Sequence, residues 1–286
     1  MAIEIRNVSK SFGRTKALDN INIKFDEGGI SGLFGNNGAG KTTLFNIIAN
    51  RIYPSVGEVF IDGESVADND HALGKIFMLS DANLYPDDMR VKRAFKVTSL
   101  FYKDFDLQYA LELAERFSLK TNKKIASLST GYASIFRIII ALSVNVPYLL
   151  LDEPVLGLDA QNRDLFYKLL LEKYGKHPCT IIISTHLIQE VSALIDQTVI
   201  IRNGYIIKNQ SRDELLSSGY TISGPAALVD EYVIGRPVLS VQNLGGLKTA
   251  CLSGKPDSDD IPEGLEAGSF DLQEYFIQLM NGEGSK

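Results

Sequence analysis

The sequence predicts an α/β fold that combines a mixed core sheet with an N-terminal antiparallel β subdomain, a helical subdomain and a small C-terminal α+β domain. Two nearly continuous apolar runs, YLLLD at 148–152 and TIIIST at 180–185, flank a helix that the pattern predicts over about 160–174. Apolar strands joined by a helix are typical of a parallel sheet with both faces buried. Residues 2–25 alternate apolar and polar instead, which predicts half-buried antiparallel strands.

The elements between these regions follow from shorter patterns. Residues 30–34 (ISGLF) predict a short buried strand, and the apolar residues after Lys41 recur at helical spacing. Residues 57–63 (GEVFIDG) predict another strand. Residues 87–127 are charged and mostly helical in pattern, which places the helical subdomain at about 87–145.

The composition of the sequence changes after about residue 217, where glycine and proline become frequent. We therefore expect a main domain over 1–217 and a small accessory α+β domain over 218–286. The strand-like pieces of this accessory domain are YTIS, VLSVQ and LKTACLS, and the helix-like pieces are PAALVDEYV and DLQEYFIQLM.

The composition excludes several classes of protein. The chain has 286 residues, of which 45% are hydrophobic, enough for a sizeable core. Its net charge is −6 and no basic patch is evident, so we expect no nucleic-acid partner. The N-terminus has no apolar signal region, and the most apolar span, 138–151, is too short to cross a bilayer. Two cysteines at no disulfide or metal spacing indicate a reducing cytosol.

A phosphate-binding loop is the strongest motif. GNNGAGKTT at 35–43 fits G-x-x-x-x-G-K-[ST] and lies between a predicted strand and a predicted helix. Its glycines let backbone N–H groups point at phosphate oxygens, and the helix N-terminus adds favourable potential. Lys41 would bind the outer phosphates, and Thr42 would offer its hydroxyl to Mg²⁺. A glycine-rich turn with a solvated lysine is the alternative. The expected nucleotide-binding residues are Gly35, Asn36, Asn37, Gly38, Ala39, Gly40, Lys41, Thr42 and Thr43.

Two carboxylates end the first apolar strand in LLLDEP, 149–154. Asp152 is expected at the C-terminal edge of the sheet, where it would hold Mg²⁺ directly or through water. Glu153 is expected to point the other way along the pleat and to orient or deprotonate the attacking water. The alternative is a strand that ends in a solvated acidic turn. His186 closes the neighbouring strand in STH, so we expect it to contact the γ-phosphate, the alternative being a structural histidine.

The order of the motifs resembles the ATP-binding subunit of ABC transporters over roughly residues 1–210. The phosphate loop is followed by LSTGY at 128–132, then LLLDEP, LGLD and STH. The sequence looks most like the bacterial ABC-2-type export ATPases. The resemblance implies a P-loop NTPase fold, ATP and Mg²⁺ as cofactors, and Mg-dependent ATP hydrolysis. It also implies a head-to-tail dimer, in which each ATP lies between one subunit's phosphate loop and the other subunit's signature loop.

The resemblance assigns further residues to the ATP site. LSTGY corresponds to the LSGGQ signature, so the Ser129 hydroxyl and the Gly131 N–H would approach the γ-phosphate of the partner's ATP. Phe12 matches the aromatic residue that stacks on adenine, and Asp159 matches the loop that crosses to the second site. A helix N-cap is the structural interpretation of Ser129 and of Asp159, and it does not exclude the binding role. A core phenylalanine is the alternative for Phe12.

Three positions depart from the family's pattern. Thr130 and Tyr132 replace a glycine and a glutamine of the signature. Ser80 occupies the slot in which the family carries a glutamine that contacts Mg²⁺ and the attacking water, and the adjacent Asp81 is the alternative substitute. In the family this loop also relays the ATP state to the membrane partner, so the coupling between them is the property that the change affects most.

The resemblance implies an ATPase subunit that powers a membrane ABC transporter, with export as the expected direction. Such a chain would be cytoplasmic and peripheral at the inner face of the cell membrane. Its partners would be a second nucleotide-binding subunit and an integral membrane subunit that docks on residues 87–127. A soluble ABC-type ATPase acting on a non-membrane partner is the first alternative. A P-loop kinase is the second, but the signature loop and LGLD would have no role in it.

Overall fold

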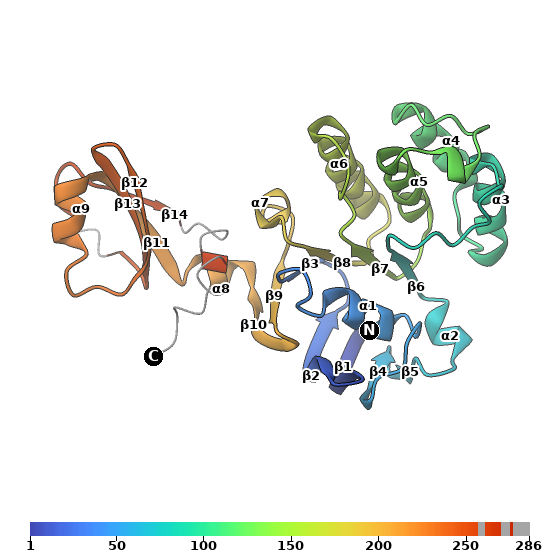
Figure 1. Cartoon of the computed structure of the whole chain (residues 1–286), viewed down its shortest axis with the longest axis horizontal. Coiled ribbons are helices and arrows are strands. Elements are labelled where there is room, and N and C mark those ends of the chain that lie inside the picture. The colour runs from blue at the N-terminus through green and yellow to red at the C-terminus, as the bar shows by residue number, and fades with distance from the viewer. Residues whose placement is uncertain (257–260, 270–274, 277–286) are drawn as a thin grey trace.

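The computed structural model describes residues 1–256, 261–269 and 275–276. Its central feature is a six-stranded sheet with the order β10-β9-β3-β8-β7-β6 (Figure 1). Neighbouring strands are parallel, except that β10 runs antiparallel to β9, so the predicted mixed sheet is confirmed. The strands are β3 Ile30–Phe34, β6 Ile76–Leu79, β7 Tyr148–Asp152, β8 Thr180–Thr185, β9 Gln197–Arg202 and β10 Tyr205–Ser211.

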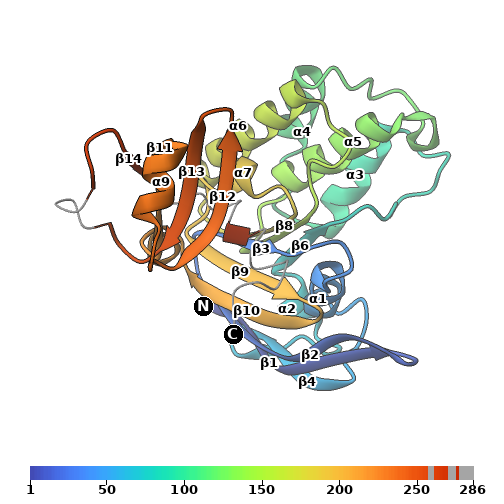
Figure 2. The same ribbon diagram turned by 60° about the vertical axis from the view of Figure 1, so that its left-hand side comes forward.

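Both faces of this sheet are buried, as the apolar runs predict. Leu33 and Leu150 enter the core beneath α1, whereas Phe34 and Leu149 enter a second core with α5 and α6. Both ribbon views show α3 to α6 on one side of the sheet and α1 on the other (Figures 1 and 2). The helices that cover the sheet directly are α1 Lys41–Ile48, α5 Thr130–Ser143 and α6 Ala160–Lys176. The last of these confirms the helix predicted over 160–174.

A second, antiparallel sheet lies on the α1 side and has the order β2-β1-β4-β5. Its strands are β1 Ala2–Phe12, β2 Thr15–Asp26, β4 Val56–Ile61 and β5 Glu64–Ser65. In β2 the buried residues Ile21, Ile23 and Phe25 alternate with exposed ones, because side chains of a strand point to opposite faces in turn. The antiparallel strands predicted over 2–25 are therefore confirmed.

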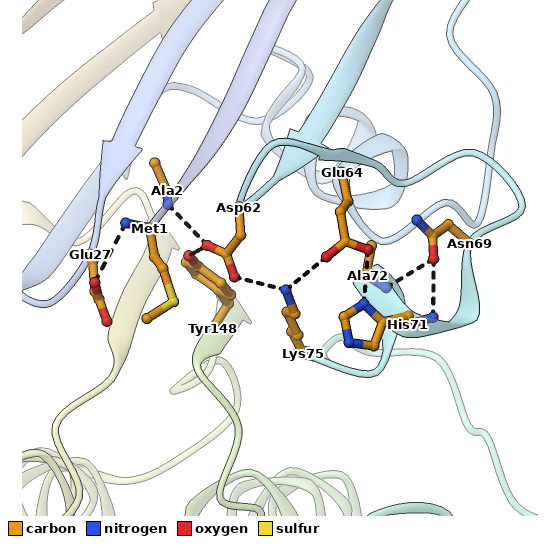
Figure 3. A network of polar contacts seen from close by, with 10 residues as sticks. All are labelled: Met1, Ala2, Glu27, Asp62, Glu64, Asn69, His71, Ala72, Lys75 and Tyr148. Carbon is orange, nitrogen blue, oxygen red and sulfur yellow. Dashed lines mark hydrogen bonds and ion pairs between the residues drawn. The ribbon is translucent and has the colours of Figure 1, made fainter.

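A polar network joins this antiparallel sheet to the core sheet (Figure 3). The carboxylate of Asp62 accepts hydrogen bonds from the Ala2 N–H at 3.1 Å, from Lys75 Nζ at 3.0 Å and from the Tyr148 hydroxyl. Lys75 also contacts Glu64 at 3.2 Å, and Glu64 contacts His71 at the start of α2 (Asp70–Leu73). Because Tyr148 begins β7, the network fixes the strand that ends in the acidic pair.

The helical region covers the other side of the sheet and confirms the helical pattern of 87–127. Its elements are α3 Val91–Phe101, α4 Leu107–Arg116 and the short 3₁₀ helix Ile125–Ser127, followed by α5. Phe95 of α3 stacks on Phe136 of α5 with ring centroids 5.8 Å apart. These contacts attach the helix that follows LSTGY to the rest of the region.

The C-terminal region builds a third sheet, β12-β13-β11-β14, which is entirely antiparallel. Short helices α7 Ile188–Val191 and α8 Arg212–Leu216 come before it, and its elements are β11 Gly219–Pro225, α9 Ala226–Tyr232, β12 Val238–Leu244, β13 Leu247–Ser253 and β14 Glu266–Ser269. The predicted strand pieces and the PAALVDEYV helix are confirmed, and the sheet has its own small core. Figure 1 shows this sheet set apart from the core sheet.

Phe276, close to the C-terminal limit of the described residues, packs against the core sheet. Most of the DLQEYFIQLM piece lies outside the described residues. Phe276, which belongs to it, is buried and packs edge-on against Phe34 with centroids 6.4 Å apart. In the part of the chain that the structure describes, no helix has the length and apolar character needed to cross a bilayer.

Candidate nucleotide site

The phosphate loop connects β3 to α1, and its glycines are required by close backbone contacts. Gly40 has a φ of 113°, and a Cβ there would lie 2.8 Å from the Ala17 carbonyl oxygen. A Cβ on Gly35 would lie 2.5 Å from the Ile201 carbonyl oxygen. Because no side chain caps the N-terminus of α1, its first N–H groups are available to a phosphate.

Lys41 is the first residue of α1, where the loop ends, and is 5% exposed. Its Nζ donates to the Gly35 carbonyl at 2.7 Å and to the Asn36 carbonyl at 3.4 Å, and it lies 3.4 Å from Glu153 Oε1. A cavity of about 160 Å³ opens beside it, lined by Asn37, Gly38, Thr43 and other loop residues. The loop therefore offers a cation, several N–H groups and space for a phosphate chain.

Asp152 ends β7 beside the loop and is 8% exposed. Burial raises the pKa of its carboxyl group, although hydrogen bonds from the Ser184 and Thr42 hydroxyls act in the opposite direction. The Thr42 hydroxyl and the Asp152 carboxylate are hard oxygen donors of the kind that Mg²⁺ prefers. No cluster of three metal-ligating side chains occurs among the described residues. These two groups therefore fit a Mg²⁺ that keeps water and phosphate oxygens as its other ligands.

Glu153 follows the strand in an unusual backbone conformation. Its φ is 44°, in the left-handed region that side chains other than glycine rarely adopt, and its N–H donates to the Ser184 carbonyl at 2.9 Å. This turn, rather than the pleat that we expected, sets its direction, because the strand ends at Asp152. Its carboxylate lies 3.0 Å from His186 Nδ1 and near Lys41. Strained backbone of this kind is concentrated at functional sites.

The signature residues lie at the exposed N-terminus of α5. The Ser129 hydroxyl accepts a hydrogen bond from the Tyr132 N–H at 3.4 Å, so the N-cap interpretation is confirmed. Asp159 caps α6 in the same way, accepting from the Asn162 N–H at 2.8 Å, and that hydrogen bond lowers the pKa of Asp159. Gly131 lies against the loop before α6, because a Cβ on it would be 3.3 Å from the Gly157 carbonyl oxygen. The start of α5 and the loop before α6 therefore lie side by side.

Phe12 ends β1 and is 52% exposed, so the alternative of a core phenylalanine is wrong. Lys10 Nζ lies 5.1 Å from the centroid of its ring. An exposed aromatic ring can stack on a nucleotide base.

The Ser80–Asp81 segment follows β6 and borders the same site. Together with Thr42, Asp152 and Glu153, it lines a cavity of about 530 Å³. Two arginines that the sequence patterns did not single out contact this segment. Arg51 donates to Ser80 Oγ at 3.0 Å, and Arg137 donates to the Asp81 carbonyl. Arg137 is the only charge within the apolar run of α5, which is a signal that could have identified it.

Residues 18–156 match a family described as ABC transporter. The ABC transporter ATP-binding protein YtrB of Bacillus subtilis (strain 168) is 26% identical over 74% of this chain and 73% of its own length. Ribose import ATP-binding protein RbsA 2 of Rhizobium meliloti (strain 1021) is 30% identical over 85% of this chain, which spans only 51% of that relative.

A solved structure described as the dimeric, post-hydrolysis state of the ATP-binding cassette MJ0796, bound to ADP and Pi, has the same fold. Its TM-score is 0.65 at 24% identity, covering 73% of this chain and 98% of the cassette. The phosphate loop, the acidic pair and the capped signature helix lie on this fold in the order that the sequence predicts. Residues 18–156 therefore belong to the ABC transporter family, and the chain has the P-loop NTPase fold of an ATP-binding cassette.

Proposed function

We propose that the chain hydrolyses Mg-ATP to power a membrane ABC transporter that works in the export direction. The observation that carries hydrolysis is the placement of Glu153, whose carboxylate contacts both Lys41 and His186 at the mouth of the phosphate loop. Support for export is the resemblance of the motifs to ABC-2-type ATPases, whereas the name of the Rhizobium relative says import. A transport assay decides the direction.

In this proposal the chain's residues divide the work of hydrolysis. The loop N–H groups and Lys41 bind the β- and γ-phosphates, and Thr42 and Asp152 hold Mg²⁺, which neutralises developing phosphate charge when it is bound. Glu153 orients the attacking water and accepts its proton. His186, 3.0 Å from Glu153, keeps that carboxylate in place and would contact the γ-phosphate.

The signature residues would act on the ATP of a second subunit. Ser129 and Thr130 are exposed at a helix N-terminus, where partial positive charge and N–H donors favour a phosphate. Asp159 begins the neighbouring helix and would reach the same interface. The solved cassette described as dimeric supports the pairing of two such subunits.

A membrane subunit would dock beside the helical region, on the cytoplasmic side of the membrane. An apolar cavity of about 240 Å³ lies between the loop that holds Leu84 and Tyr85 and the elements that hold Ile125 and Phe136. Leu84 is an exposed apolar side chain at its rim. This cavity adjoins the segment 87–127 that the sequence predicts as the docking surface.

We divide the chain accordingly into an ATP-binding domain over 1–217, with its helical subdomain at about 87–145, and an accessory domain over 218–286. The separate small core around Ile222, Val229 and Leu252 supports this boundary. The accessory domain would have a regulatory or assembly role, since none of the proposed catalytic residues belongs to it.

The proposal is tested by affinity capture from detergent-solubilised membranes combined with a phosphate-release assay. We expect a multi-span membrane protein to co-purify and to stimulate phosphate release from Mg-ATP. Stimulation by ribosomes or DNA, with no membrane partner, would favour the soluble ABC-type ATPase instead. Transfer of the γ-phosphate to an acceptor other than water would indicate a kinase.

A further inference from the structure

Two arginines from different parts of the fold donate hydrogen bonds to the Ser80–Asp81 segment, which lies where the family has its glutamine loop. Arg51 follows α1, the helix that begins in the phosphate loop. Its Nη1 donates to Ser80 Oγ at 3.0 Å and its Nη2 donates to the Met78 carbonyl at 3.3 Å. Ser80 itself is only 7% exposed, so the guanidinium of Arg51 is a partner for a hydroxyl that would otherwise be buried without one.

The second arginine reaches the same segment from the opposite side. Arg137 belongs to α5, two turns after the signature residues. Its Nη1 donates to the Asp81 carbonyl, and its Nη2 donates to Ser134 Oγ at 3.0 Å. Its Nε is buried and has no hydrogen-bond partner among the described residues. An unsatisfied buried Nε–H is costly, and the hydrogen bonds of Nη1 and Nη2 are the contacts that offset this cost.

We propose that Arg51 and Arg137 are positioning residues that clamp the Ser80–Asp81 segment at the nucleotide site. A serine side chain is too short to do what a glutamine does at this slot. The clamp instead ties the segment to the phosphate-loop helix through Arg51 and to the signature helix through Arg137. This inference rests on the proposed function and deepens it, because it identifies how a cassette that lacks the glutamine connects its phosphate-loop helix to its signature helix.

The geometry gives the two arginines different tasks. Arg51 makes two hydrogen bonds through one planar fork, which a lysine cannot reproduce. Arg137 donates hydrogen bonds to the backbone carbonyl of Asp81 and to the side chain of Ser134 in its own helix. It therefore links the position of α5 to that of the segment. The cavity that both Ser80 and Arg137 line also contains Asp152 and Glu153. A displaced segment would therefore disturb the metal and water positions without altering the phosphate loop.

The test uses the full chain, with Arg51→Met and Arg137→Met as the variants. Hydrogen exchange of residues 80–85 in nucleotide-free protein should accelerate about tenfold in each variant, because each loses a hydrogen bond to a charged donor. The affinity for ATP should stay within about twofold, whereas kcat should fall and the Mg²⁺ concentration for half-maximal activity should rise. Arg116→Met, an exposed arginine on α4 that pairs with Glu172, is the matched control.

Two further variants keep the test decisive. Arg51→Gln retains an amide donor and serves if Arg51→Met does not fold. It should accelerate hydrogen exchange at residues 80–85 less than Arg51→Met does. In a Ser80→Gln background, Arg51→Met should lower kcat less than in the natural chain, because the longer side chain reaches the site by itself. Unchanged exchange at 80–85 in both arginine variants would overturn the clamp. Since exchange is measured without nucleotide, an inactive cassette would count against the proposed function alone.

Discussion

The phosphate-loop half of the site and the signature half differ in how buried their functional side chains are and in what those side chains bond to. In the phosphate-loop half, residues 35–43 with Asp152 and Glu153, Lys41 and Asp152 are buried and hydrogen-bonded within the chain. The signature half, residues 128–132 with Asp159, is more exposed, and the Ser129 and Asp159 side chains cap the first turns of their own helices. In the proposed function the first half binds the nucleotide of its own chain, and the second half meets the nucleotide that another subunit brings.

Replacing Glu153 should have the largest effect, because it removes the group that distinguishes hydrolysis from binding in the phosphate-loop half. We expect Glu153→Gln to lower kcat by about 10²- to 10⁴-fold, the usual contribution of a general base. ATP-bound dimers should then accumulate on gel filtration with Mg-ATP. Glu172→Gln, at an exposed position of α6, is the control and should leave phosphate release unchanged. Normal turnover in Glu153→Gln would remove this residue from the proposed role.

The signature half is tested by a substitution that blocks an interface while preserving the monomer. Ser129→Arg should abolish ATP-dependent dimerisation and most hydrolysis, because it puts a bulky side chain where the partner's γ-phosphate would lie. Binding of ATP to the monomer, measured with a fluorescent analogue, should be unchanged. Ser211→Arg is the matched control, since Ser211 is also an exposed N-cap but lies on α8, far from the signature residues. If Ser129→Arg hydrolyses ATP at the natural rate, the two halves do not meet across subunits.

Phe12 extends the comparison to the base of the nucleotide. Because its ring is exposed next to Lys10, we expect Phe12→Ala to weaken ATP binding by about 1–3 kcal/mol, roughly 5- to 150-fold in Kd. Phe12→Tyr should retain most of the affinity, since the stacking surface remains. Phe101→Ala removes another exposed phenylalanine, at the end of α3, and should have no effect. Equal affinities of Phe12→Ala and the natural chain for ATP would show that the base lies elsewhere.

The same contrast explains what could be predicted from the sequence. The phosphate loop and the fully buried strands β7 and β8 were predictable, because local motif and apolar pattern determine them. The left-handed turn at Glu153 was not, since the carbonyl that accepts its N–H belongs to Ser184 on another strand. The contact of Arg51 with Ser80 joins residues 29 positions apart and leaves no periodic signal. β14, whose sequence EAGS lacks a strand pattern, forms only because it pairs with β11.

The hydrogen-bond network at Asp62 holds β7, the strand that carries Asp152. Replacing Asp62 should therefore affect the site least among these predictions. Burial alone would raise the pKa of Asp62, but hydrogen bonds from Tyr148 and Lys75 hold it below its ordinary value. A carboxyl group with a lowered pKa in the folded state stabilises the protein fully above the unfolded pKa of about 3.9, and this contribution is lost as the pH falls through the folded value. Replacing Asp62 should therefore cost stability at neutral pH and progressively less in acid.

Asp62→Asn is the sharpest version of this experiment, because the amide can still accept from Ala2 and Tyr148 but faces Lys75 with a donor. We expect a loss of about 1–3 kcal/mol in the free energy of unfolding at pH 7, measured by urea denaturation. The difference should shrink below about pH 4, where the natural carboxylate also becomes protonated. Asp26→Asn breaks an exposed pair with Lys24 and should cost less than about 1 kcal/mol. A difference between Asp62→Asn and the natural chain that stays constant from pH 7 to pH 3 would mean that charge at Asp62 does not hold the antiparallel sheet to β7.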